Sequence, residues 1–276
     1  MLDIDEALRR DFLGAAPRGG QMVQPWCAGD AAPAKTVRVR LRYRFSWRGP
    51  DPATLPGGVR LALERPDLYA ISLNGAPVAQ PPADGPWWVD PCLRLVDLPA
   101  GAIRRGANEL TLDCTAYHAG LPGLEAAFLL GAFGVAADGA TATPLPAALR
   151  PGDVCAQGLP NYSGNLSYFV RPRVPAKGPC RLRVDRWRGT ALGFRLNGGA
   201  EVFRPWPPYE AVFDDGLRRD GTDEIEIVVY GHRRNAFGPF YVKGGVDTPE
   251  WCGPGQMRDT SAFPVRALVP FGLGAV

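Results

Sequence analysis

The chain has 276 residues, a formal net charge of +3 at pH 7 and 46% hydrophobic residues. This hydrophobic content excludes a generally disordered protein, and the lack of an apolar run of about 18 residues excludes a membrane-spanning helix. Glycine (34) and proline (29) recur too often for long helices, so the composition favours short β-strands joined by turns. Neither the small net charge nor the apolar pattern predicts a nucleic-acid or membrane partner.

Residues 1–34 are predicted to form a leader that precedes the first domain. Asp5–Leu13 has the pattern of a short helix, with Asp3 or Asp5 as its N-cap and Gly14 as its stop. The start of the chain lacks the basic residues and apolar stretch of a secretion signal. We therefore expect a cytoplasmic protein.

The clearest predicted strand runs from Val37 to Phe45, where apolar residues alternate with arginines at positions 38, 40, 42 and 44. Alternation with a period of two predicts one buried face and one solvated face. A stripe of arginines is also compatible with nucleic-acid binding. A solvated strand face is the simpler interpretation, because charged side chains there also discourage pairing with other strands.

Similar patterns predict two β domains, over residues 35–138 and 161–276, joined by a linker over residues 139–160 that is rich in alanine, glycine and proline. In the first domain the predicted strands are Val59–Leu63, Tyr69–Leu73, Leu93–Leu98, Asn108–Cys114 and Ala126–Val135. In the second domain they are Leu166–Val170, Cys180–Val184, Ala191–Leu196, Ala211–Phe213 and Glu224–Tyr230.

The two predicted domains share landmarks in the same order. Leu73-Asn74-Gly75 returns as Leu196-Asn197-Gly198, and the Asn-Gly dipeptide suits a type I′ hairpin turn. Gly106-Ala107-Asn108-Glu109-Leu110 returns as Gly221-Thr222-Asp223-Glu224-Ile225. A repeat of this length indicates a duplicated domain. Phe133-Gly134-Val135 and Phe271-Gly272-Leu273 are expected to be the same closing strand.

This order of strand, Leu-Asn-Gly hairpin, tryptophan-rich loop and Gly-x-Asn-x-Leu strand resembles the galactose-binding-like jelly rolls of large bacterial glycoside hydrolases, including β-galactosidase-like and α-L-rhamnosidase-like enzymes. The tryptophan-rich loops are Trp87-Trp88-Val89-Asp90 and Pro205-Trp206-Pro207-Pro208-Tyr209. Gly221-x-Asp223 departs from the usual Gly-x-Asn. The resemblance covers roughly residues 35–276.

The resemblance implies an all-β protein with two tandem antiparallel jelly-roll β-sandwiches. It also implies a non-catalytic carbohydrate-binding or accessory region. Because such modules follow a catalytic barrel in those enzymes, the expected partners are a glycan or glycoside and a glycoside hydrolase catalytic domain. Two alternatives stay open: a purely structural or assembly role without sugar binding, and a glycoside hydrolase in its own right.

Aromatic residues in the matched loops are the candidate sugar platforms, because the C–H faces of a pyranose stack on aromatic rings. Packing within the domain is the ordinary explanation for aromatic rings at these positions. Polar neighbours would supply selectivity. The second domain is favoured, because prolines on both sides of Trp206 fix its backbone. The candidates there are Trp206, Tyr209, His232 and Asn235, and those in the first domain are Trp87, Trp88 and Asp90.

Independent catalysis has little support in the sequence. A glycosidase needs two carboxylates that face each other, and no pattern fixes such a pair. No Gly-x-Ser-x-Gly elbow or phosphate-binding glycine loop is present. The carboxylates considered are Asp90, Glu125, Glu210, Asp214 and Asp215.

The chain gives no motif for a metal or a cofactor. Its six cysteines are scattered without a Cys-x-x-Cys pair, and only two histidines are present, so a zinc site is not expected. The sequence likewise carries no signal for structural calcium. Cys114 and Cys180 lie in apolar strand patterns and are predicted to be buried free thiols in a reducing compartment.

Overall fold

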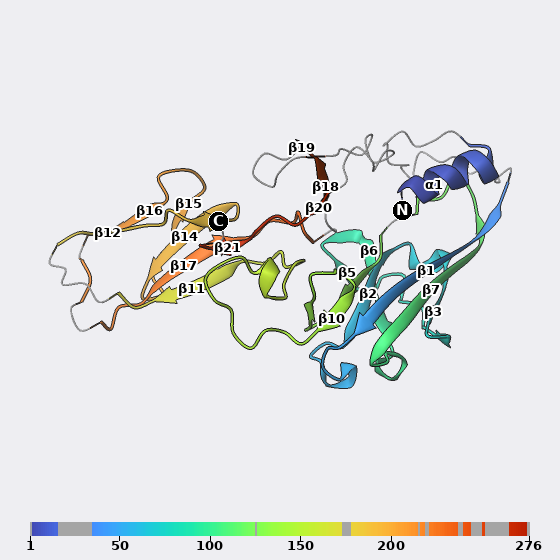
Figure 1. Ribbon diagram of the computed structural model, residues 1–276, viewed down its shortest axis with the longest axis horizontal. Coiled ribbons are helices and arrows are strands. Elements are labelled where there is room, and N and C mark those ends of the chain that lie inside the picture. Colours follow the sequence, from blue (N-terminus) through green and yellow to red (C-terminus); the bar gives the residue numbers. More distant parts are fainter. Residues whose placement is uncertain are drawn as a thin grey trace. The chain divides into compact units, whose positions relative to one another are not determined.

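The computed structural model describes residues 2–15, 35–124, 126–172, 178–214, 216–218, 221–236, 240–243, 250–251 and 265–274. The chain forms two compact units (Figure 1). Within the described residues the protein is mainly β, with several antiparallel sheets and one short α-helix, α1 (Leu2–Ala7). The predicted β class is therefore confirmed. The first unit comprises Met1–Leu145 and Tyr241–Ala267, and the second comprises Pro146–Phe240 and Leu268–Val276.

Two sheets of the first unit share one hydrophobic core. The six-stranded sheet has the order β4-β3-β7-β1-β10-β9, and the four-stranded sheet has the order β5-β6-β2-β8. Leu61, Leu73 and Leu112 are fully buried between them. The strands are β1 (Val37–Trp47), β2 (Val59–Glu64), β3 (Ala70–Leu73), β4 (Ala76–Pro77), β5 (Trp87–Trp88), β6 (Asp90–Leu98), β7 (Gly106–Tyr117), β8 (Phe128–Leu130), β9 (Gly134–Val135) and β10 (Thr141–Thr143).

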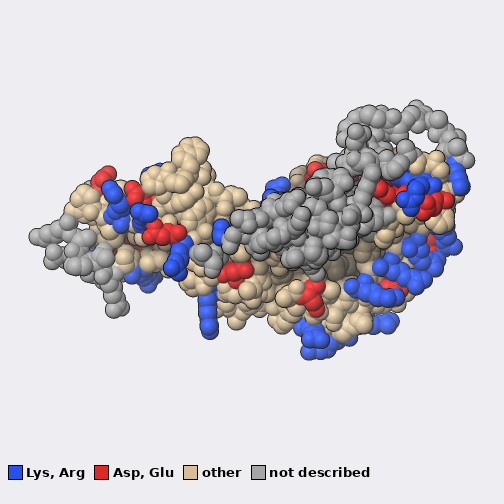
Figure 2. All heavy atoms as spheres, turned by 45° about the horizontal axis from the view of Figure 1, so that its top comes forward, with Lys and Arg blue, Asp and Glu red and all other residues tan. Residues whose placement is uncertain are grey.

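Strand β1 confirms the strand predicted from the arginine alternation and extends it to Trp47. Its apolar side faces the core, where Trp47 is 2% exposed and donates from Nε1 to the carbonyl of Pro50 at 2.8 Å. Its four arginines are exposed on the opposite side. Figure 2 shows basic side chains gathered on the side of the first unit where β1, β7 and β3 lie, with acidic side chains between them.

The N-terminal segment is helical over the predicted range, but the helix begins at Leu2, so Asp3 and Asp5 lie inside it and not at its N-cap, and the segment is part of the first unit. A π-helical turn, Leu8–Leu13, follows α1 and ends at Gly14, whose φ is 64°. Asp5 is fully buried and accepts hydrogen bonds from Arg9 Nε at 3.0 Å, the Tyr117 hydroxyl at 3.1 Å and the Leu124 amide at 3.0 Å. A leader that only joins two domains would not bury an ion pair. Residues 16–34 of the predicted leader lie outside the described residues.

The second unit has its own core, which includes Leu192, Phe194, Val229 and Phe271. Its main sheet has the order β11-β17-β14-β15, and β12 pairs with β16 and β13 with β21. The strands are β11 (Leu166–Val170), β12 (Cys180–Arg183), β13 (Trp187–Arg188), β14 (Ala191–Leu196), β15 (Val202–Arg204), β16 (Glu210–Phe213), β17 (Ile225–Tyr230) and β21 (Gly272–Leu273). Short 3₁₀ turns lie at Pro52–Thr54, Pro66–Leu68, Ala100–Ala102 and Cys155–Gln157.

The two Asn-Gly hairpins make matching hydrogen bonds. Asn74 has a φ of 52°, donates its backbone amide to the Glu109 carbonyl at 2.8 Å and accepts the Glu109 amide on its side-chain oxygen at 2.9 Å. Its Nδ2 donates to Asn108 Oδ1 at 2.8 Å. Asn197, with a φ of 50°, binds Glu224 in the same way and donates to Asp223 Oδ1 at 2.8 Å.

Strand order also corresponds between the units. The run β4-β3-β7-β1 in the first unit matches β15-β14-β17-β11 in the second, with every neighbour antiparallel. Likewise β2 pairs with β6, and β12 pairs with β16. The expected closing strands differ, because β9 pairs with β10 whereas β21 pairs with β13.

The borders of the units differ from the predicted domain borders. Strand β10 lies in the predicted linker, yet it pairs in parallel with β1 through Ser46 and Thr141. Val154, from the same predicted linker, is 1% exposed in the second core. A further sheet, β19 (Glu250–Trp251), β18 (Phe240–Lys243) and β20 (Val265–Ala267), falls mostly in the first unit. The second unit is therefore interrupted in the sequence.

Candidate functional site

A hollow of about 400 Å³ lies on the second unit, within the range of about 300–1,000 Å³ that is typical of small-molecule sites. It forms where the end of β12 meets the segment before β16, joined by a hydrogen bond from the Val184 amide to the Tyr209 carbonyl at 3.0 Å. The Pro207–Pro208 peptide bond is cis. The residues that line the hollow are Arg183, Val184, Asp185, Pro207, Pro208 and Tyr209.

Tyr209 contributes the aromatic ring of this hollow. Its ring meets Trp187 edge-on, with 4.8 Å between the ring centroids, and both residues pack against the second core. Its hydroxyl group has no hydrogen-bond partner among the described residues. The ring is thus held in place while its polar end stays available to a ligand.

An exposed ion pair supplies the charges of the hollow. Arg183 Nε lies 2.7 Å from Asp185 Oδ1, and the two side chains are 69% and 68% exposed. Because an exposed pair of this kind contributes little to stability, both groups can exchange their mutual contact for hydroxyl groups of a ligand. Sequence analysis missed both residues. The sequence signal for these two residues was their position at the end of the alternating strand β12.

Trp206 directly precedes Pro207, which lines the hollow, and is 71% exposed. An indole this exposed, with no ring contact among the described residues, disagrees with the packing explanation for Trp206. Tyr209 lines the hollow, whereas Trp206 is not among its lining residues, and the predicted sugar site stays a prediction.

The structure assigns Asn235 to packing. Asn235 is 1% exposed, donates from Nδ2 to the Val269 carbonyl at 2.8 Å and accepts the Val269 amide at 2.9 Å. These two bonds to the Val269 backbone occupy the side-chain amide of Asn235. The expectation that Asn235 binds sugar hydroxyls is therefore wrong. Its neighbours in the sequence are polar and suggest a surface turn, whereas its partner lies 34 residues away.

His232 is half-buried against Phe271, with 5.6 Å between the ring centroids. Burial lowers the pKa of His232, and the backbone of Pro270 partly opposes this shift. Neither ring nitrogen has a hydrogen-bond partner of ordinary geometry among the described residues. His232 thus lies beside the Asn235 anchor and not among the residues that line the hollow.

The candidates of the first unit lie in the β5–β6 hairpin. Trp87 is 51% exposed, whereas Trp88 packs on Phe128 with 5.4 Å between the ring centroids. Val89 between the strands has a φ of 64°, a strained value for a β-branched residue. Asp90 is exposed, and its bonds with the side chain and amide of Cys92 lower its pKa. Trp87 and Asp90 therefore remain a second candidate surface.

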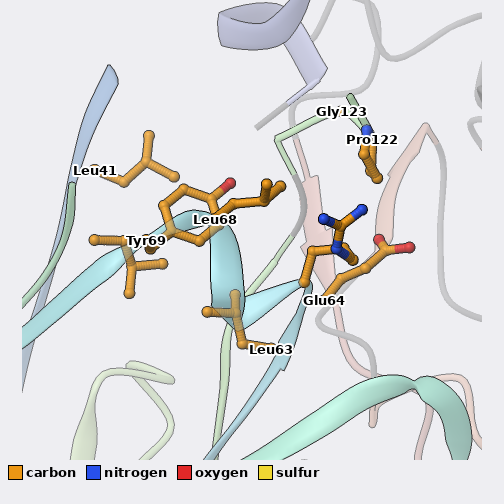
Figure 3. Close-up of a pocket in the computed structure, with 9 residues that line it drawn as sticks. Leu41, Leu63, Glu64, Leu68, Tyr69, Pro122 and Gly123 are labelled. Carbon is orange, nitrogen blue, oxygen red and sulfur yellow. The ribbon is translucent and has the colours of Figure 1, made fainter. Parts of the chain in front are cut away.

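Another crevice of the first unit is too small for a sugar. It lies beneath Leu41, Tyr69 and Pro122 and has a volume of about 10 Å³ (Figure 3). That volume corresponds to about one water molecule. Burial raises the pKa of Tyr69, which keeps its hydroxyl neutral.

No protein-family model matches the chain, and no curated protein matches it either. The geometry of the two units therefore carries the functional argument.

A network of charges on β14, β17 and the loop before β15 also escaped sequence analysis. Arg195 binds Glu226 at 2.8 Å and Glu201 at 3.0 Å. The hydroxyl of Ser167 and the guanidinium of Arg195 lower the pKa of Glu226. A general acid of a glycosidase needs a raised pKa, so Glu226 is unsuited to that role. Of the carboxylates considered above, Glu125 and Asp215 lie outside the described residues.

The described part of the chain contains no cluster of three His, Cys, Asp or Glu side chains that would hold a metal ion. No helix in that part is long and apolar enough to cross a membrane. Cys114 is a buried free thiol, as predicted, and Cys180 is free but only partly buried.

Proposed function

We propose that this chain recognises carbohydrate without cleaving it, as an accessory region of a glycoside hydrolase. The hollow lined by Tyr209 carries the proposal, because it combines an anchored aromatic ring with an exposed charged pair, and the exposed indole of Trp206 directly precedes one of its lining prolines. Stacking on Trp206 and Tyr209 supplies affinity. Arg183 and Asp185 select among hydroxyl arrangements, because charged groups make the stronger hydrogen bonds to them.

We also propose that both units are versions of one antiparallel jelly-roll sandwich. The matching bonds of Asn74 and Asn197 and the corresponding strand orders support this. They agree with the resemblance to galactose-binding-like modules in the order of hairpin and Gly-x-Asn-x-Leu strand. The two copies differ at β9, β10 and β21, and in the sheet that contains β2 and β6, which has four strands where the corresponding sheet of β12 and β16 has two.

Titration calorimetry of the full chain with neutral sugars, including galactose, rhamnose and glucose and their oligosaccharides, tests the function. We expect one of them to bind and Trp206→Ala to weaken its binding about tenfold, or about 1.4 kcal/mol. Because Trp206 is 71% exposed, this variant should fold normally. Asp185→Asn should lower affinity and change the order of preference among the sugars.

Trp87→Ala, which removes an exposed indole from the first unit, is the matched control and should bind as wild type does. If Trp87→Ala abolishes binding and Trp206→Ala does not, the assignment to the second unit is wrong. If the wild-type chain binds no member of the panel, the structural or assembly alternative replaces the proposal.

A further inference from the structure

The outer face of the six-stranded sheet carries a second hollow, of about 540 Å³, on the first unit. It lies over three neighbouring strands, β1, β7 and β3, where alternation exposes one residue in two. This is the region of gathered basic side chains in Figure 2. Its polar lining residues are Arg40, Arg42, Ser72, Glu109, Thr111 and Asp113.

The outer arginines of this face are paired within the protein. Arg38 and Arg40 both bind Asp113, at 2.8 Å and 2.6 Å. These two arginines hold the pKa of Asp113 well below its usual range. At the other end Arg44 binds Glu109 at 3.2 Å.

The middle row has the opposite character. Arg42 on β1 lies opposite Thr111 on β7, and Thr111 lies opposite Ser72 on β3. Among the described residues, none of these three side chains makes a hydrogen bond or an ion pair. A guanidinium and two hydroxyl groups thus lie in one line across the hollow, all able to donate to the same acceptor.

We propose that this hollow binds the carboxylate group of an acidic sugar, with Arg42 as its anchor and Thr111 and Ser72 as hydroxyl donors. The planar guanidinium matches a carboxylate through two parallel hydrogen bonds. That the carboxylate belongs to a sugar rests on the proposed function of the chain. The anion site itself rests only on the row of unpartnered donors.

The charges around the row favour a single negative charge on the ligand. Three of the four arginines on this face are paired with carboxylates, so Arg42 supplies the one unpaired positive charge of the row among the described residues. Glu109 and Asp113 lie two residues to either side of Thr111 on the same strand and repel a second negative charge. A uronate fits this arrangement better than a phosphate dianion or a nucleic acid.

Calorimetry of the full chain with sodium glucuronate at low ionic strength tests the site, with glucose as the neutral comparison. We expect glucuronate to bind and glucose to bind more weakly at this site. Arg42→Gln should weaken glucuronate binding at least tenfold, and Thr111→Val should weaken it by a smaller factor. Arg171→Gln, which removes the same charge from an exposed pair of the second unit, should leave it unchanged.

Trp206→Ala separates this proposal from the preceding one, since it weakens neutral-sugar binding and should leave glucuronate binding intact. Equal glucuronate affinity in wild type and in folded Arg42→Gln overturns the site. Displacement of glucuronate by equimolar sulfate or by a short single-stranded oligonucleotide overturns its assignment to a carboxylate. Arg42 is exposed, so circular dichroism should show an unchanged fold in the variant.

Discussion

Asn108 and Asp223 occupy the same place in the two units but differ in charge. Asn108 accepts the Arg104 amide and Asn74 Nδ2, and its own amide donates to two carbonyl groups. Asp223 accepts Asn197 Nδ2 and both the backbone and side chain of Arg218. The corresponding turn is therefore held by amide bonds in one unit and by an ion pair in the other.

This difference makes the second unit sensitive to acid. The bonds from Asn197 and Arg218 lower the pKa of Asp223 to about 2. Since the pKa is lower in the folded state, the contribution to stability is present above about pH 4 and is lost as the pH falls toward 2. We expect Asp223→Asn to reduce the slope of unfolding free energy against pH in this window. Urea unfolding between pH 2.5 and 5 measures it, and equal slopes would contradict the assignment.

Single residues were the hardest scale to predict. The Asn-Gly turns were recognisable because both central residues need positive φ, which few residues tolerate. Asn235 was misassigned, because burial depends on Val269, a partner that no local pattern reveals. Arg42 was correctly placed on a solvated face, yet its lack of a partner depends on the register between β1 and β7.

Among the secondary-structure elements, alternation predicted the long strands well. Strands β1, β2 and β17 begin within one residue of their predicted starts. Strand β10 was missed, because a three-residue strand has too few positions to show alternation and its neighbour β1 is distant in the sequence. The N-terminal helix was predicted, but its docking was not, since that depends on the buried pair Asp5–Arg9.

That buried pair gives a prediction for the first unit. Asp5 and Arg9 have side-chain exposures of 0% and 4%. Asp5→Ala leaves Arg9 without its carboxylate and Tyr117 and Leu124 without an acceptor, so we expect a loss of roughly 3–5 kcal/mol of unfolding free energy. Urea unfolding measures this change. Asp11→Ala, which breaks the exposed pair with Arg10, is the control and should have no measurable effect.

For the molecule as a whole, the order of landmarks predicted a duplication, and the matching hairpins agree with it. The interruption of the second unit by residues 241–267 was not predictable, because those residues show no break in composition that assigns them to the first unit. The segment that completes the second core is therefore the end of the chain. Phe271 is 1% exposed there, and its carbonyl accepts the Val154 amide at 2.9 Å.

Removal of residues 268–276 should consequently unfold the second unit and leave the sheets of the first unit folded. The deletion removes Phe271 from the core, β21 from its pairing with β13, and the partner of Asn235. Limited proteolysis followed by mass spectrometry should show new cleavage sites confined to residues 146–240. Phe271→Ala in the full chain is the milder variant, with an expected cost of about 3–5 kcal/mol. Protection of residues 146–240 in the truncated chain would contradict the assignment.

The two Asn-Gly hairpins also determine where the protein is prone to chemical modification during storage. Asparagine before glycine is the sequence most prone to deamidation, which replaces the amide by a carboxylate. In the first hairpin that carboxylate would face the Ala102 carbonyl and Asn108 Oδ1, where Nδ2 now donates. In the second it would face the carboxylate of Asp223, so two like charges would meet at hydrogen-bonding distance. Prolonged storage at neutral or alkaline pH should therefore damage the second hairpin more than the first.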